Sequence, residues 1–293
     1  VIRSLMYYFS KLIIFLFSLL IGFLSSEESL LLGGYPLIYY SICLSFSIHW
    51  LAFLPSYIYK TEKFYDFIGM LTYISVICMV IYSKYVILGK IDVHSIILSI
   101  LILVWTLRLG LFLFYRISKV GKDDRFTEIK KSFAHFLVTW TISAMWVCLS
   151  MAAALTVLTS NINSGLTFFT YFGIILWCFG FVFEVVADYQ KTLFKNNSDN
   201  SNKFITSGLW SLSRHPNYFG EIILWIGIAV IVLPLLSGWQ YISLISPFFV
   251  YFLLTSISGV NLLEKKAEKN WSDLDTYQEY KKRTPVLIPK FWN

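Results

Sequence analysis

Apolar runs of about 20 residues recur along almost the whole chain, and a helix of that length crosses the hydrocarbon core of a membrane. Apolar residue types fill 57% of the 293 positions and only 14% are charged, whereas about a quarter of a soluble domain is charged. The sequence therefore predicts an all-α membrane protein, a bundle of seven or eight transmembrane helices, and excludes a large soluble domain. We expect spans near residues 5–24, 37–58, 66–83, 93–115, 134–158, 166–187, 218–236 and 241–263.

The basic residues indicate which way this bundle faces. Of the 24 Lys and Arg residues, 20 lie near the N-terminus, in the second, fourth and sixth connections, or after the last span. By the positive-inside rule, both termini and these three loops then face the cytoplasm. This orientation, with contact to anionic lipids, accounts for the net charge of +7. We therefore expect membrane lipids as partners, and neither nucleic acid nor an obligate protein partner.

Nothing in the sequence divides the chain into separate domains. It has no internal repeat and no Gly/Ser linker, so residues 1–293 are expected to form one integral membrane domain. The four cysteines show no CxxC spacing, which argues against a metal site and a disulfide framework. Alternatively, the first apolar run is a signal segment, but no A-x-A-like cleavage site follows it.

Five ionisable residues stand out within or at the ends of the predicted spans, where charges are costly and are functional candidates by default. They are Asp66, Arg108, Glu184, Asp188 and Glu221. Glu184 and Asp188 are four residues apart, as are Asn217 and Glu221, so each pair shares one helix face. We expect these two faces, with Arg108, to line one polar cavity beneath the cytoplasmic loops. The alternative is that the charges form buried salt bridges that only hold helices together.

The stretch 188–217 is predicted to be a cytoplasmic loop that leads into the seventh span. Pro216 suits the first turn of a helix, and the free backbone amides there, with Asn217, can donate to an anion. Arg214 and His215 add positive charge beside that helix start, so a phosphate-bearing ligand fits this position. Alternatively, aromatic side chains anchor the loop at headgroup level and Arg214 contacts lipid.

Several separated motifs resemble the bacterial steroid 5α-reductase-like family, long catalogued as a domain of unknown function. The motifs are "SGLWSLSRHPNYFGEI", "ADYQKTLFK", "WTLRLG" followed by "GKDDRF", and "YQEYKKRTPVLIPKFW", and the resemblance runs from about Asp66 onward. It implies a membrane fold whose cytoplasmic half holds NADPH, with residues 188–293 as the C-terminal cofactor-binding part. It also implies hydride transfer to the β-carbon of an enone in a lipophilic, steroid-like substrate, and a bacterial inner membrane or endoplasmic reticulum location.

The resemblance assigns roles to individual residues. Asp66 falls where the steroid enzymes use a Glu to hold the substrate carbonyl, and Trp105 replaces the Tyr that shares this duty. Because an indole N–H donates a hydrogen bond but does not usefully release a proton, the proton donor and the substrate stay open. The residues expected to bind the cofactor are Arg108, Arg125, Glu184, Asp188, Lys195, Arg214, His215, Asn217, Tyr218, Glu221 and Lys265.

The tail after the last span alternates charged and aromatic residues, which predicts an interfacial helix that ends before Pro285. Lys265 and its basic neighbours are expected near the cofactor phosphates, with simple headgroup contact as the alternative. Two other functions fit parts of the chain. "RHPNY" and the tail also resemble isoprenylcysteine carboxyl methyltransferases, which bind S-adenosylmethionine, and intramembrane charges also suit a non-enzymatic transporter or lipid-binding protein.

Overall fold

The computed structural model describes residues 2–162, 164–257 and 259–291, and they are almost entirely helical. Within these residues seven helices are long and apolar enough to cross a membrane, and a shorter apolar stretch, Ser10–Ser25, lies in the first helix. The chain is therefore a multi-pass integral membrane protein, and the predicted all-α class is confirmed.

Packing divides the chain into two compact units. Unit 1 comprises Val1–Thr167 and Val232–Ser246, and unit 2 comprises Phe168–Ile231 and Pro247–Asn293. The elements that lie wholly in unit 1 are α1 (Ile2–Ser25), β1 (Leu31–Leu32), β2 (Tyr35–Pro36), α2 (Leu37–Ile58), α3 (Tyr65–Leu88), α4 (Val93–Val120), α5 (Phe126–Ile129), α6 (Phe133–Ser150), α7 (Ala152–Leu158), and the 3-10 turns η2 (Leu233–Leu235) and η3 (Gly238–Leu244).

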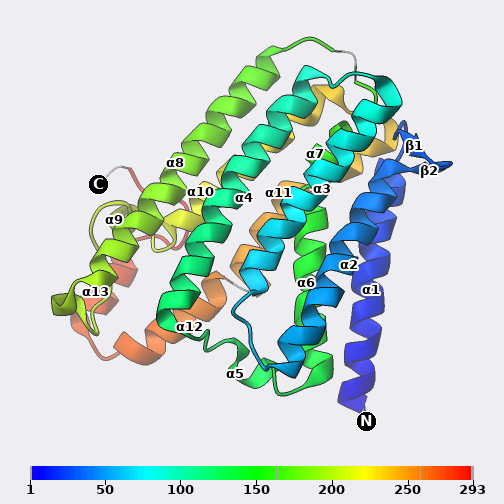
Figure 1. The fold of residues 1–293 in the computed structure, drawn as a ribbon. Coiled ribbons are helices and arrows are strands. Elements are labelled where there is room, and N and C mark those ends of the chain that lie inside the picture. Colours follow the sequence, from blue (N-terminus) through cyan, green and yellow to red (C-terminus); the bar gives the residue numbers. More distant parts are fainter. Residues whose placement is uncertain (1, 163, 258, 292–293) are drawn as a thin grey trace. The chain divides into compact units, whose positions relative to one another are not determined.

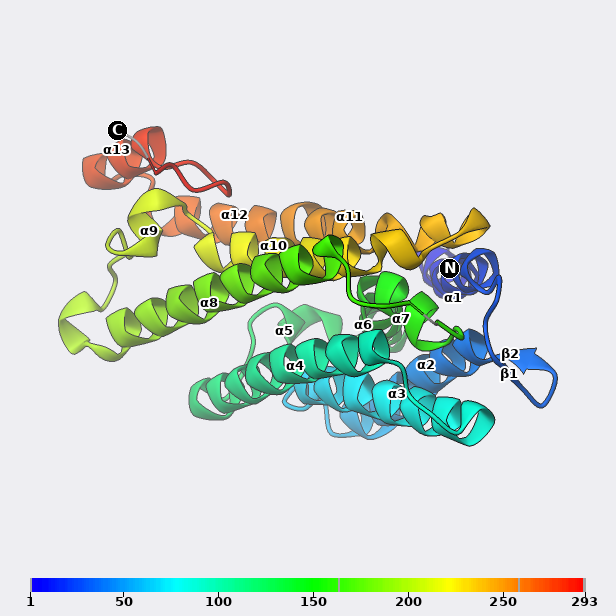
Figure 2. The ribbon, with the colours of Figure 1, turned by 90° about the horizontal axis from the view of Figure 1, so that it is seen from above.

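Unit 1 is a helical bundle in which α2 packs against α3 and α6, α4 packs on α3, and α1 packs on α6 (Figures 1 and 2). Its helix ends follow the local sequence. Gly89 ends α3 with a φ of +69°, a left-handed conformation that favours glycine. Asp92 then caps α4 by accepting a hydrogen bond from the Ser95 N–H. The tiny antiparallel hairpin β1–β2 connects α1 to α2.

Unit 2 contains the motifs from about Asp188 onward, including the tail, whereas "WTLRLG" and "GKDDRF" lie in unit 1. Its elements are α8 (Phe168–Asn196), the 3-10 turn η1 (Ser198–Asn200), α9 (Leu209–Leu212), α10 (Pro216–Val232), α11 (Ile245–Phe252), the π-helical turn η4 (Leu253–Ile257), α12 (Val260–Trp271) and α13 (Asp275–Arg283). The last residue of α10 and the first two residues of α11 belong to unit 1. Figure 2 shows α8 and α10 running side by side.

Four glycines allow α8 and α10 to touch backbone to backbone, and we call them the glycine seam: Gly173 and Gly180 on α8, and Gly220 and Gly227 on α10. A Cβ added to Gly180 would lie 2.5 Å from the carbonyl oxygen of Gly220, and one added to Gly220 would lie 2.6 Å from that of Gly180. Small residues at such an interface let membrane helices approach closely, so van der Waals packing holds them together.

Several predicted boundaries differ from the structure. α8 continues to Asn196, so the region 188–217 is not a single loop and Asp188 lies inside the helix instead of at its end. The predicted span 134–158 is two helices, α6 and α7, which meet at Met151; beside this break the Ser150 hydroxyl donates back to the Trp146 carbonyl at 2.6 Å. The tail forms α12 and α13 instead of one helix, and α13 ends before Pro285 as predicted.

Candidate functional site

Three buried carboxyl side chains lie along the α8–α10 interface, and we call Glu184, Asp188 and Glu221 the acidic cluster. Each is less than a tenth exposed. The Asn217 amide of α10 donates to Asp188 Oδ1 on α8 at 3.2 Å. Gly220, which precedes Glu221, contacts the backbone of Glu184. The glycine seam thus brings together the two helix faces that the four-residue spacings predicted.

The start of α10 carries positive charge that a carboxylate on α12 holds in place. Arg214 Nη1 lies 2.6 Å from Glu264 Oε2, and His215 Nε2 lies 2.8 Å from Glu264 Oε1. The His215 ring stacks on Tyr218, with centroids 5.7 Å apart. Because Pro216 opens the helix as predicted, the first turn of α10 lies beside these two basic side chains.

His215 is 4% exposed, and this burial lowers the pKa of its imidazole, while the Glu264 carboxylate opposes the shift. In the neutral form, Nε2–H donates to Glu264 and Nδ1 is an acceptor. Neither His215 Nδ1 nor Arg214 Nε has a hydrogen-bond partner among the described residues. Buried polar atoms are normally satisfied, so these two atoms point to a ligand at the start of α10.

The segment before α10 is fixed from two sides. The Trp210 indole N–H donates to the Ala187 carbonyl of α8 at 3.0 Å, and the Tyr280 hydroxyl of α13 donates to the Trp210 carbonyl at 2.6 Å. Lys191 Nζ lies 4.3 Å from the centre of the Trp210 ring. The "SGLWSLSRHPNY" motif therefore forms an ordered platform between α8 and the tail.

In unit 1, charged residues gather around Asp66 at the start of α3. The charges of Arg125, Arg116 and Asp123 act on Asp66, which is half-buried. Arg125 Nη2 lies 2.6 Å from Asp123 Oδ2. Burial alone would raise the pKa of Asp123, but hydrogen bonds and charge from Arg125 hold it below its ordinary value. The structure thus brings Asp66 near Arg125 of the "GKDDRF" loop.

Trp105 and Arg108 occupy different surroundings on α4. Trp105 is 2% exposed and meets the Tyr73 ring edge to face, with centroids 5.4 Å apart. The Tyr73 hydroxyl lies 2.6 Å from Ser150 Oγ. Arg108 is half-buried, with its guanidinium 5.5 Å from the centre of the Phe112 ring. A phenol therefore lies against the tryptophan that replaces the expected Tyr.

The other candidates are more open to solvent or lipid. Lys195 in the last turn of α8 and Lys265 on α12 are exposed, whereas Tyr218 is half-buried against His215. Within the part of the chain that the structure describes, no three His, Cys, Asp or Glu side chains are grouped so that they hold a metal ion.

Sequence analysis missed two carboxylates that organise this chemistry. Glu264 looked like the first charge of an interfacial tail, yet it is the shared partner of Arg214 and His215. Glu62 is 6% exposed; it accepts the Asp123 N–H at 2.9 Å and lies 2.5 Å from Lys130 Nζ, so it fixes the "GKDDRF" loop. The signal available in the sequence was charge, because each of these two carboxylates is opposite in sign to basic residues in or beside the motif that it contacts.

Sequence analysis also missed Lys84, a buried cation at the other end of α3. It is fully buried and lies 2.5 Å from Asp92 Oδ2 and 2.7 Å from Ser95 Oγ. It falls just beyond the predicted end of its span. These contacts tie α3 to the start of α4.

Comparison with known proteins places these motifs in a family. A family model described as "Protein of unknown function (DUF1295)" matches residues 52–284. The 3-oxo-5-alpha-steroid 4-dehydrogenase 1 of Rattus norvegicus is 27% identical over 117 residues, 40% of each chain. That of Macaca fascicularis is 29% identical over 114 residues, 39% of this chain and 38% of its own. The predicted resemblance to this group is confirmed.

A shorter match involves a different chemistry. The probable O-methyltransferase ustE of Ustilaginoidea virens is 41% identical over 58 residues, 20% of each chain. The chain therefore spans about two fifths of the length of the two dehydrogenases and one fifth of the methyltransferase. No solved structure matches it significantly.

Proposed function

The chain belongs to the DUF1295 family, and from that premise we propose that it is a membrane-embedded, NADPH-dependent reductase. Its substrate would be lipophilic and steroid-like, with a carbon–carbon double bond conjugated to a carbonyl. The distant similarity to 3-oxo-5-alpha-steroid 4-dehydrogenase 1 supports this class of reaction. The observation that carries the proposal is that unit 2 combines a buried acidic cluster between α8 and α10 with a basic start of α10.

The residues of unit 2 fit a dinucleotide at both ends. At the start of α10, Arg214, His215 and the first-turn amides can bind phosphate and ribose oxygens through donors and through the acceptor His215 Nδ1. Asn217 and the acidic cluster can accept hydrogen bonds from the carboxamide of the nicotinamide. The negative charge of the cluster also favours the nicotinamide ring, which becomes positively charged when it gives up the hydride. NADPH, when bound, supplies the hydride.

Unit 1 would hold and activate the substrate carbonyl. As the double bond is reduced, negative charge develops on the carbonyl oxygen, and positioned donors in a dry site stabilise that charge. Asp66 donates only when it is protonated, and the Trp105 N–H donates in any state. Tyr73, packed on Trp105, is a phenol of unit 1 that can carry a proton. In this proposal both termini and the basic loops face the cytoplasm, where NADPH is found.

A second candidate is transfer of a methyl group from S-adenosylmethionine. The match to the probable O-methyltransferase supports it, and a sulfonium cation also suits the acidic cluster. S-adenosylmethionine offers the basic start of α10 one carboxylate and no phosphate, whereas NADPH offers a diphosphate and a 2′-phosphate. We therefore favour the reductase.

Ligand-dependent thermal stability of the detergent-purified protein tests both candidates. A ligand present at 100 times its Kd raises the free energy of unfolding by about 2.7 kcal/mol. We expect NADPH to raise the melting temperature and S-adenosylmethionine to leave it unchanged. A shift with S-adenosylmethionine alone would replace the reductase by the methyltransferase, and a shift with neither would sink both.

Paired variants locate the binding site. Asn217→Ala and Glu221→Ala should abolish most of the NADPH-dependent shift. Asn270→Ala on α12 and Glu279→Ala on α13 remove the same residue types from exposed positions of the same unit and should leave the shift intact. An NADPH shift that survives both site substitutions contradicts the assignment to α10.

A further inference from the structure

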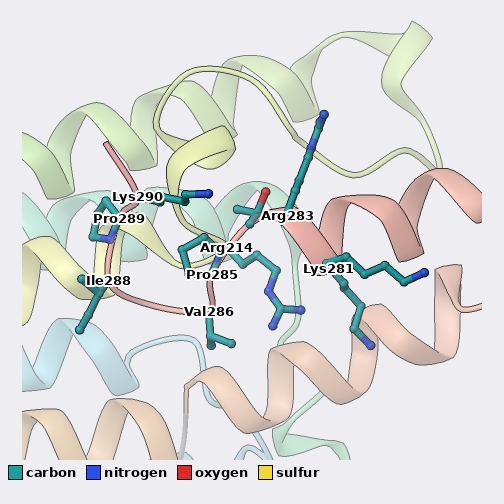
Figure 3. Close-up of a pocket in the computed structure, with 10 residues that line it drawn as sticks. Arg214, Lys281, Arg283, Pro285, Val286, Ile288, Pro289 and Lys290 are labelled. Atoms are coloured by element: carbon teal, nitrogen blue, oxygen red, sulfur yellow. The ribbon is translucent and has the colours of Figure 1, made fainter. Parts of the chain in front are cut away.

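A second basic feature lies at the C-terminal tail, beyond the acidic cluster and the start of α10. It is a shallow cavity of about 470 Å³ that we call the basic cavity, shown in Figure 3. Its lining residues are Arg214, Lys281, Lys282, Arg283, Thr284, Pro285, Val286, Ile288, Pro289 and Lys290. Five of the ten are basic and none is acidic, so the cavity favours an anion.

Three of these cations have no acidic partner among the described residues: Lys282, Arg283 and Lys290, all exposed. Lys281, by contrast, lies 2.5 Å from Glu268 Oε2, and Arg214 is bound to Glu264. Lys282 and Arg283 stand in the last turn of α13, where cations complement the helix dipole. Lys290 lies beyond the helix, so the dipole does not account for its place in the cavity.

The wall of the basic cavity is held in place by backbone contacts. The Arg214 N–H donates to the Pro285 carbonyl at 2.9 Å, and the Lys290 N–H donates to the Leu212 carbonyl at 3.0 Å. The Ser213 hydroxyl donates to the Leu287 carbonyl at 2.8 Å. The segment 285–290 is therefore pinned on the α9–α10 connection, which fixes the backbone that carries Lys290.

Apolar side chains are exposed beside these charges. Ile288 is 70% exposed and Phe291 is 61% exposed, and Val286 forms part of the cavity wall. Basic side chains next to exposed apolar ones are typical of segments that lie in the membrane interface. The lining includes no aromatic ring, amide or carboxylate with which a nucleotide base could be read.

We propose that the basic cavity binds the phosphodiester headgroup of an acidic phospholipid, with Ile288 and Phe291 against its acyl region. The charges attract the phosphate, and the exposed apolar residues explain why the phosphate belongs to a lipid and not to a soluble nucleotide. This inference does not require the proposed reductase activity: the cavity shares Arg214 with the start of α10, but its three cations without an acidic partner, Lys282, Arg283 and Lys290, lie outside the proposed cofactor site.

The test compares two lipids and a soluble anion on the intact, detergent-purified chain. Short-chain phosphatidylglycerol should raise the melting temperature with saturation, whereas the matching phosphatidylcholine and inorganic phosphate should not. The triple variant Lys282→Gln/Arg283→Gln/Lys290→Gln should bind phosphatidylglycerol about 100-fold more weakly, from about fivefold for each basic residue.

A matched control removes the same net charge from other exposed lysines. Lys90→Gln/Lys122→Gln/Lys203→Gln should leave phosphatidylglycerol binding unchanged. If both triple variants weakened phosphatidylglycerol binding equally, the effect would come from general surface charge, and the proposal would be overturned. Phosphate, NADPH or phosphatidylcholine binding at the three residues in place of phosphatidylglycerol would also overturn it.

A single apolar substitution keeps the proposal testable if the triple variant does not fold. Ile288→Ser should weaken phosphatidylglycerol binding several-fold, because the side chain loses its apolar contact with the lipid. Unchanged lipid affinity in this variant would contradict a lipid occupant.

Discussion

Substitution of Gly220 by alanine tests whether the glycine seam positions the candidate site. A Cβ at this position would lie 2.6 Å from the Glu184 nitrogen and from the Gly180 carbonyl oxygen, whereas ordinary contact begins near 3.4 Å. Both neighbours are backbone atoms that cannot swing away. The α8 and α10 backbones must therefore separate by about 0.8 Å, and overpacking of this kind costs about 1–3 kcal/mol.

The separation should also damage the site. The Asn217 amide lies 3.2 Å from Asp188 Oδ1, and a shift of this size lengthens the contact beyond hydrogen-bond range. Hydrogen bonds to charged groups contribute about 1.5–3 kcal/mol, so NADPH should bind about 10- to 100-fold more weakly to the Gly220→Ala protein. The melting temperature without ligand should fall by several degrees.

Gly69 provides a matched control on α3. A Cβ there meets nothing within 4 Å, so Gly69→Ala should be neutral or gain up to about 1 kcal/mol from better helix propensity. Melting curves and NADPH titrations of both variants decide the question. Equal behaviour of the two, whether both are unaffected or both are destabilised, would refute the argument that backbone contact at the seam builds the site.

The remaining predictions concern ion pairs. Lys84→Met should destabilise unit 1 by about 3 kcal/mol, measured by thermal unfolding, because it leaves Asp92 partly buried without its cation; the double variant with Asp92→Asn should recover part of this loss. Burial raises the pKa of Asp92, but hydrogen bonds and the charge of Lys84 lower it more, so the pKa lies below its ordinary value. The ionised Asp92 therefore stabilises the folded protein above about pH 4, and this stabilisation is lost as the pH falls further. Melting curves between pH 3 and pH 7 should therefore differ less for Asp92→Asn than for the natural protein. Glu264→Gln should weaken NADPH binding and lower the melting temperature, since Arg214 and His215 lose their common partner; an unchanged NADPH titration would count against a cofactor role for the start of α10.

The number and type of spans follow from hydropathy, but their ends do not. The polar stretch after Asp188 reads as a loop, yet it consists largely of good helix formers, and α8 continues through it to Asn196. At the break at Met151, the hydroxyl of Ser150 bonds back to its own helix. Such local competition between side chain and backbone leaves little trace in an average over 20 residues.

Only the relations within single helices of the candidate site could be predicted from the sequence. Four-residue spacing correctly grouped residues within α8 and within α10, because a single helix fixes those relations. Contacts between distant segments, such as Glu264 with Arg214, depend on how the tail folds back. The seven-residue spacing of the glycine pairs on α8 and on α10 was a visible signal for helix contact, and it identifies which two faces meet.

The acidic cluster lies on a helix interface that already has close backbone packing. The glycine seam already brings α8 and α10 into backbone contact, which is how membrane helices associate without polar links. The insertion of a carboxylate within a span costs up to about 3 kcal/mol of free energy, so three carboxylates on one interface make membrane insertion less favourable. In the proposed reductase, a bound group that carries amide donors and becomes positively charged would convert that cost into binding affinity.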